Sequence, residues 1–123
     1  MNETDLDPGQ QMRVIDDELA HIWMVRAFLK HCEEAVDDEE LASVHRDLYD
    51  YMLALGPALD ADNSAAYLKL AHKKFGKLSK ACELFQVIQP EVSSHTNFVM
   101  AASSLKQSVR RIGQLLKAFP RSQ

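Results

Sequence analysis

The sequence has few of the residues that cross-link or interrupt a chain: two cysteines, four glycines and four prolines among 123 residues. Cys32 and Cys82 are too few for a disulfide framework, and a reducing compartment would keep both as thiols. The low glycine and proline content, with 46% apolar and 26% charged residues, is typical of a globular helical protein. A chain of this length is expected to form one domain with its own core.

Long apolar runs are absent as well, and none approaches the roughly 20 residues that are needed to span a bilayer. The first ten residues, MNETDLDPGQ, are acidic, whereas a secretory signal begins with basic residues and then becomes apolar. We therefore expect a cytoplasmic protein that makes no contact with a membrane.

Each half of the chain is poor in charge of one sign. Residues 1–62 hold 16 acidic and 4 basic residues, whereas residues 63–123 hold 2 acidic and 10 basic ones, for a net charge of −4. Such asymmetry can indicate charged partners. We favour an internal explanation, in which an acidic helical hairpin packs beside a basic one, because complementary fields help to specify which elements meet.

The sequence shows neither the period-two alternation of strands nor an Asn-Gly turn between apolar runs. Its apolar residues recur three and four positions apart, which is the helical period. The segment Leu19–Leu29 is apolar on nearly every side, so more than one neighbouring helix must cover it. Short connections favour an all-α, antiparallel, up-down-up-down four-helix bundle. We expect a disordered acidic N-terminus at 1–7 and one domain at 8–120, with helices at about 8–36, 38–55, 63–89 and 94–119.

Capping residues and prolines define the expected helix ends. Asp7, followed by Pro8 and by Gln10, predicts that the first helix begins with a capping box. Gly56-Pro57 predicts the end of the second helix, and Pro90 that of the third. The other predicted N-caps are Asp37, Asp62 or Asn63, and Ser93 or Ser94.

The predicted second helix is about ten residues shorter than the others, which would uncover roughly 15 Å at one end of the bundle. Soluble monomers seldom expose such a patch, so we expect a homodimer or another form of self-association to cover it. The contact surface would use apolar residues outside the main helix seams: Trp23, Met24, Leu70, Leu84 and Ile88.

Four cysteines and histidines fall on apolar helix faces: Cys32, His45, Cys82 and His95. In the expected topology the first three reach a similar depth, and thiolate and imidazole are ligands of zinc. The alternative is core packing, because buried cysteine behaves as a small apolar residue. No CxxC or HxxxH spacing fixes two ligands locally, so a zinc site depends wholly on the assumed topology.

Glu18 lies within the seam of the first helix, and a buried carboxylate needs a partner. We expect a buried ion pair with Arg110 or Arg111, which reach a similar depth on the fourth helix. Glu18 and His21 also have the Glu-x-x-His spacing of di-iron bundles. The third and fourth helices offer only two glutamates, both near helix ends, so the ligand count excludes a di-iron site.

The segment Ala71–Gly76, AHKKFG, resembles the short motif of the histidine-phosphotransfer family, in which lysine and glycine follow the reactive histidine at the third and fourth positions. The resemblance implies that His72 accepts a phosphoryl group and that Gly76 lets a partner approach. Phe75 stands in place of the lysine, and the match covers six residues. The other interpretation is that His72 belongs to a solvated basic flank of the third helix.

Signatures of hydrolytic enzymes are absent: there is no nucleophile elbow, glycine-rich phosphate loop or metalloprotease motif. A reactive couple of Cys32 or Cys82 with His45 is disfavoured, because apolar burial raises the pKa of a thiol. We therefore lean towards a protein that is not an enzyme.

The basic half also invites comparison with nucleic-acid-binding proteins, but the pI of about 5.7 argues against it, since a binding domain is usually basic as a whole. The sequence thus favours a small helical bundle that acts as a protein-interaction or self-assembly module. The alternatives are a metal- or small-ligand-binding bundle with a Cys/His core site, and a phosphotransfer protein that uses His72. The basic half that was compared with nucleic-acid-binding proteins contains Lys69, Lys73, Lys74, Lys77, Lys80, Lys106, Arg110, Arg111, Lys117 and Arg121.

Overall fold

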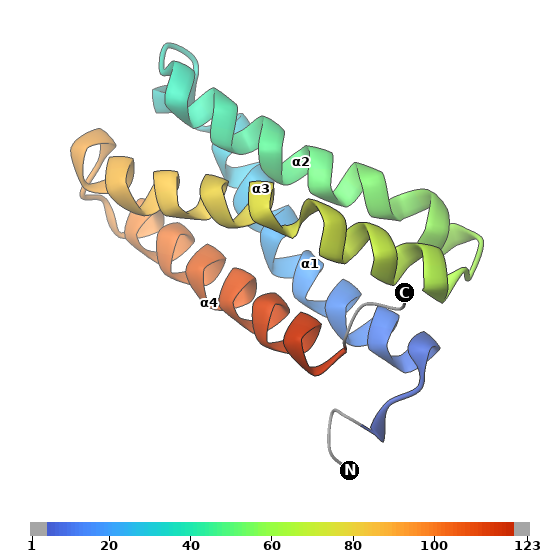
Figure 1. Ribbon diagram of the computed structural model, residues 1–123. Helices are drawn as coiled ribbons and strands as arrows, with labels where there is room; N and C mark the ends of the chain where they lie inside the picture. Colours follow the sequence, from blue (N-terminus) through green and yellow to red (C-terminus); the bar gives the residue numbers. More distant parts are fainter. Residues whose placement is uncertain (1–4, 120–123) are drawn as a thin grey trace.

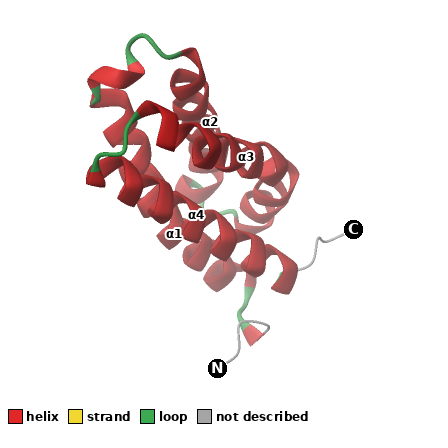
Figure 2. Ribbon diagram, turned by 90° about the vertical axis from the view of Figure 1, so that its left-hand side faces the viewer, coloured by secondary structure: helices red, strands yellow, loops and turns green. Residues whose placement is uncertain are grey.

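Four long helices account for almost all of residues 5–119, the part of the chain that this computed structural model describes (Figure 1). They are α1 (Pro8–His31), α2 (Glu39–Asp60), α3 (Ser64–Val92) and α4 (Thr96–Ala118), with the 3₁₀ turn η2 (Glu33–Ala35) between α1 and α2. Residues 5–119 contain no strand (Figure 2), so the predicted all-α class is confirmed.

Each helix packs against the next one along the chain, and α4 returns to pack against α1. Because the connections are short, consecutive helices run antiparallel, and the arrangement is the predicted four-helix bundle. α1 contacts all three other helices, as expected for the apolar segment Leu19–Leu29. Its buried residues are Met12, Ile15, Leu19, Ile22, Val25, Arg26 and Leu29.

The second helix is longer than the sequence predicted, because α2 continues through Gly56-Pro57 to Asp60. Proline lacks the N–H that would bond to the carbonyl four residues earlier. That carbonyl belongs to Leu53, which lies on the exposed face, where water can satisfy it. Burial of Leu55 and Ala58 in the core holds the helix on both sides of the proline.

α2 therefore has 22 residues, close to the 24 of α1 and the 23 of α4. The predicted short second helix is wrong, and so is the uncovered end of the bundle that a second copy was expected to cover. α3 likewise continues past Pro90 to Val92, where the Gln89 side chain donates to the Ser93 carbonyl (2.8 Å). In contrast, α1 ends before the predicted position, because Cys32 is extended.

Two of the predicted helix starts are confirmed. The Asp7 carboxylate accepts from the Gln10 amide (2.8 Å) and the Gln10 side chain accepts from the Asp7 amide (3.0 Å), which completes the capping box. Asn63, one of the two alternatives for α3, accepts from the amide of Ala66 (3.1 Å).

The other two caps lie further along the chain than predicted. Asp38, not Asp37, caps α2 by accepting from the amides of the second and third helical residues (3.0 Å each). His95, rather than Ser93 or Ser94, caps α4, because its Nδ1 accepts from the Asn97 amide (3.0 Å). Histidine can take this role because a neutral ring nitrogen is an acceptor.

Parts of the predicted N-terminal segment and domain end, residues 1–4 and 120, lie outside the described residues. Leu6, which was expected to be disordered, packs against the core, and its carbonyl accepts from the Gln11 side chain (2.9 Å). Within residues 5–119, no helix has both the length and the apolar character that crossing a bilayer requires.

Candidate functional site

The four predicted metal ligands lie in separate environments. Cys32 ends α1 and its thiol donates to the Leu29 carbonyl (3.2 Å), while His95 is exposed at the start of α4. Cys82 is buried in α3, and His45 of α2 faces α1. No group of three or more His, Cys, Asp or Glu side chains in residues 5–119 is arranged to hold a metal ion.

Both thiols are held in their protonated form. Burial is the largest cause, and it raises the pKa of Cys32 and of Cys82 above the ordinary value of a thiol. A thiol with a raised pKa is a poor nucleophile and a poor metal ligand at neutral pH. The structure therefore offers no support for a zinc site or a thiolate couple.

Glu18 and Arg111 line one shallow pocket between α1 and α4, together with His21. Glu18 is half-buried there, and its ion pair with Arg111 stays a prediction. Arg110 does not face this pocket. It is exposed on the opposite flank of α4 and lines a groove beside α3.

The predicted apolar contact surface is dispersed. Trp23 and Met24 are exposed, whereas Leu70 and Leu84 are half-buried against the core. Ile88 is buried, so its assignment to an interface is wrong.

Arg26 forms a cluster between α1 and α2 that the sequence analysis did not identify. Its guanidinium carbon lies 4.0 Å from the centroid of the Trp23 ring and 5.3 Å from that of Tyr49. Its Nη1 donates to Nε2 of His45 (3.3 Å), and its buried Nε has no hydrogen-bond partner. Burial and the neighbouring cations Arg26 and Lys30 lower the pKa of His45. The cluster joins α1 to α2, and we regard it as structural.

A shallow, open groove of about 510 Å³ lies between α3 and α4. Its floor contains Phe75, and Arg110 and Lys117 are exposed along its α4 wall. Gly113 makes room for the Phe75 ring, because a Cβ atom at this position would lie 3.0 Å from its Cζ. The lining residues of this α3–α4 groove are His72, Phe75, Ser79, Val109, Arg110, Gly113, Gln114, Leu116 and Lys117.

His72 closes one end of the α3–α4 groove. Its Nε2 donates to the Phe119 carbonyl (2.6 Å), which ties the middle of α3 to the residue after α4. The histidine is therefore half-buried and bonded, not part of a solvated flank. Gly76, one turn along α3, has open space around it.

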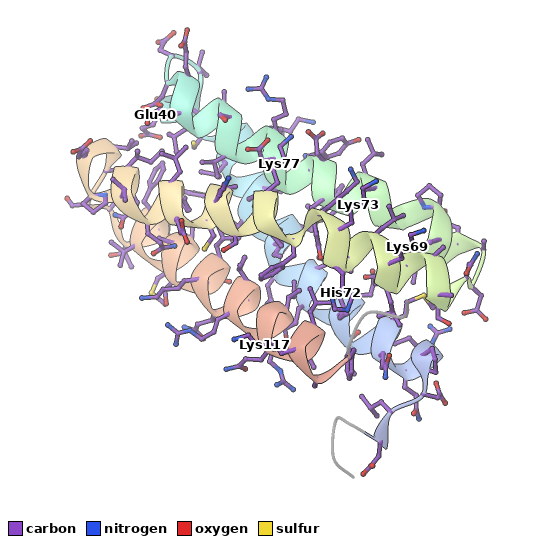
Figure 3. The ribbon with its side chains drawn as sticks, viewed as in Figure 1. Glu40, Lys69, His72, Lys73, Lys77 and Lys117 are labelled. Atoms are coloured by element: carbon purple, nitrogen blue, oxygen red, sulfur yellow. The ribbon has the colours of Figure 1, made fainter. Side chains whose placement is uncertain are left out.

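Basic side chains lie on both α3 and α4. Lys69, Lys73 and Lys77 follow one another along α3, whereas Lys117 lies on α4, apart from them (Figure 3). The predicted pairing of an acidic hairpin with a basic one holds at Lys77, whose Nζ lies 3.5 Å from Asp47 and 4.0 Å from Asp50 of α2.

The basic residues at the α3–α4 groove are not neutralised in this way. Within the part of the chain that the structure describes, neither Arg110 nor Lys117 forms an ion pair with an acidic side chain. Lys73, on the adjoining turn of α3, forms none either. The acidic half therefore leaves a positive surface that the sequence analysis expected it to cover.

The sequence contained a signal for this groove, because Arg110, Gly113 and Lys117 recur at three and four residues along α4. What it did not reveal was that Phe75 of α3 lies against Gly113. No protein-family model, curated protein sequence or solved structure matches the chain.

Proposed function

We propose that this protein is an interaction module that binds an acidic segment of a partner protein in the α3–α4 groove. The observation that carries the proposal is the combination of an apolar floor at Phe75 with basic side chains, Arg110 and Lys117, that have no acidic partner among residues 5–119. Arginine pairs with carboxylates through two parallel hydrogen bonds, and complementary charge favours the correct partner. An apolar side chain between the carboxylates would pack on Phe75.

The groove suits a protein segment better than a nucleic acid. Val109 and Leu116 join Phe75 in lining it, and an apolar floor has little to offer a phosphate backbone. The net charge of −4 would also repel a nucleic acid at a distance. A short acidic segment carries far fewer charges and is repelled less.

Phosphotransfer through His72 is the alternative that one observation favours, namely the open space around Gly76. Against it, Nε2 of His72 is engaged with the Phe119 carbonyl, and Phe75 packs against Gly113 where the family has a lysine. Treatment of the protein with acetyl phosphate, followed by mass spectrometry, tests this alternative. Phosphate on His72 would support it, and an unmodified His72 would eliminate it.

Binding can be measured by fluorescence anisotropy with a labelled synthetic peptide of glutamates around one central leucine. We expect saturable binding that weakens with salt, and that weakens about tenfold when Arg110→Glu reverses one charge of the groove wall. Arg46→Glu is the matched control, because it makes the same change at an exposed site on α2. It should leave the affinity unchanged.

Three results would count against the proposal: no binding of the peptide, equal weakening by both variants, or equal binding of a peptide whose leucine is replaced by serine. A labelled single-stranded oligonucleotide serves as the comparison probe. Should it bind the α3–α4 groove more tightly than the peptide, the groove would be a nucleic-acid site instead.

A further inference from the structure

The connection between α1 and α2 presents acidic side chains around an exposed valine. Glu33, Glu34 and Asp37 are exposed, and Val36 among them is 79% exposed, more than any other large apolar side chain in residues 5–119. We call residues 33–37 the acidic tip. Asp38 is excluded from it because its carboxylate caps α2.

The acidic tip has a defined backbone, which makes it suitable for recognition. Its amides close 3₁₀ hydrogen bonds, from Ala35 to the Cys32 carbonyl (3.3 Å) and from Val36 to the Glu33 carbonyl (3.1 Å). A structured loop loses less conformational entropy on binding than a flexible one. Val36 is not part of the core formed by residues 5–119, so its apolar side chain stabilises nothing there by burial.

The acidic tip and the α3–α4 groove are complementary in charge and in hydrophobicity. The tip places carboxylates around an apolar side chain, and the groove places Arg110 and Lys117 beside Phe75. We infer that the partner is a second copy of this chain, whose acidic tip enters the α3–α4 groove with Val36 against Phe75. This inference rests on the proposed function and names the acidic segment.

The tip cannot enter the groove of its own chain. It lies at the end of the bundle where α1 ends and α2 begins, whereas Lys117 lies near the C-terminal end of α4 (Figure 3). In an antiparallel bundle these are opposite ends. At about 1.5 Å per residue, they are separated by roughly 30 Å along α4.

In such an association each copy donates one surface and accepts with a different one. Two antiparallel copies can close it reciprocally as a two-fold dimer, and a head-to-tail repeat of the same contact gives rings or open chains. The contact joins carboxylates to basic side chains at an exposed site, so it should be strongest at low salt and weaken as the Debye length shortens.

Sedimentation velocity of the full chain tests the inference. We expect the weight-average sedimentation coefficient to rise with protein concentration at low salt, and this rise to disappear in about 0.5 M NaCl. A tip variant, Glu34→Lys with Val36→Lys, and a groove variant, Arg110→Glu with Lys117→Glu, should each remain monomeric. All four positions are exposed, and circular dichroism will confirm that each variant is folded.

The decisive measurement is a mixture of the two variants. The tip variant keeps an intact α3–α4 groove and the groove variant keeps an intact acidic tip, so an equimolar mixture should form a complex that neither variant forms alone. Asp17→Lys is the matched control for the tip variant, because it removes an exposed carboxylate from α1 far from the tip. It should associate like the original chain.

Association that persists in either variant, or a mixture that stays monomeric while the original chain associates, would overturn the inference. An original chain that is monomeric at every concentration tested would overturn it too. In that case binding of the glutamate–leucine peptide separates the two claims: a peptide that binds leaves the proposed function standing with another partner, and one that does not removes both.

Discussion

Arg26 is the only charged residue that is fully buried in residues 5–119, with 7% of its surface exposed and no acidic partner there. Burying a cation without a counterion is costly. The Trp23 and Tyr49 rings offset part of that cost by cation–π interaction. The guanidinium can only donate, so Nε2 of His45 must accept and the imidazole must be neutral.

The lowered pKa of His45, of which burial is the largest cause, makes stability depend on pH. Because the pKa of His45 is lowered in the folded protein, the unfolded chain takes up a proton first as the pH falls. The stabilising contribution is fully present above the ordinary histidine pKa of about 6.5, and it is lost as the pH falls from there through the lowered value. His45→Gln retains an acceptor for Arg26 but does not titrate in this range.

We expect urea unfolding between pH 7.5 and 5.5 to show a larger loss of stability for the original chain than for His45→Gln. Burial raises the carboxyl pKa of Asp16, so Asp16 contributes with the opposite sign, but it does so in both proteins and cancels in their comparison. Parallel pH profiles for the two proteins would show that the Arg26–His45 bond does not depend on the protonation of His45.

At the scale of the helix, two glycines illustrate how one sequence feature can have two structural roles. Gly76 and Gly113 both lie within helices, where glycine costs about 1 kcal/mol relative to alanine. A Cβ at Gly76 would meet no neighbour, whereas a Cβ at Gly113 would crowd the Phe75 ring at 3.0 Å. The packing of the Phe75 ring therefore requires a glycine at position 113, whereas no neighbouring atom requires one at position 76.

Gly76→Ala should raise the free energy of unfolding by about 0.5–1 kcal/mol, because it removes backbone entropy from the unfolded chain at no steric cost. Gly113→Ala should gain less or lose stability, since Phe75 must move. Urea unfolding of the two variants checks the difference. An equal gain at both positions would mean that the Phe75 ring shifts freely and that the floor of the α3–α4 groove is soft.

At the scale of the whole molecule, charge is arranged in blocks that are only partly neutralised. Lys69, Lys73 and Lys77 recur four residues apart along α3, so each repels the next, and Lys77 alone of the three reaches acidic residues of α2. The acidic tip is a second block of like charge. We expect repulsion within each block to oppose folding, because exposed ion pairs contribute little to stability.

Salt should therefore stabilise the monomer. We expect the urea midpoint, measured at concentrations too low for association, to rise between low salt and about 0.5 M NaCl. Lys73→Gln removes the repulsion of Lys73 with Lys69 and with Lys77. This variant should be about 0.5 kcal/mol more stable at low salt and less sensitive to salt. A midpoint that falls with salt would show instead that ion pairs dominate the electrostatic contribution.

The sequence by itself determined the all-α class, the four antiparallel helices, the central position of Leu19–Leu29 and the Asp7 cap. These follow from interactions within a helix or between its nearest neighbours, namely apolar periodicity and side-chain hydrogen bonds at helix ends. Local signals also predicted helix ends at Gly56-Pro57 and Pro90, where the helices in fact continue.

Only the tertiary structure decided those ends. In α2, burial of Leu55 and Ala58 on either side of Pro57 outweighs the local cost of the proline. It also decided which charges are paired and where a groove forms. The contacts of Arg26 with His45 and of Phe75 with Gly113 depend on which helix faces meet, and that is set by side chains far apart in the chain. A pattern along one helix carries no information about its neighbour's register, so the candidate site emerged only from the packed bundle.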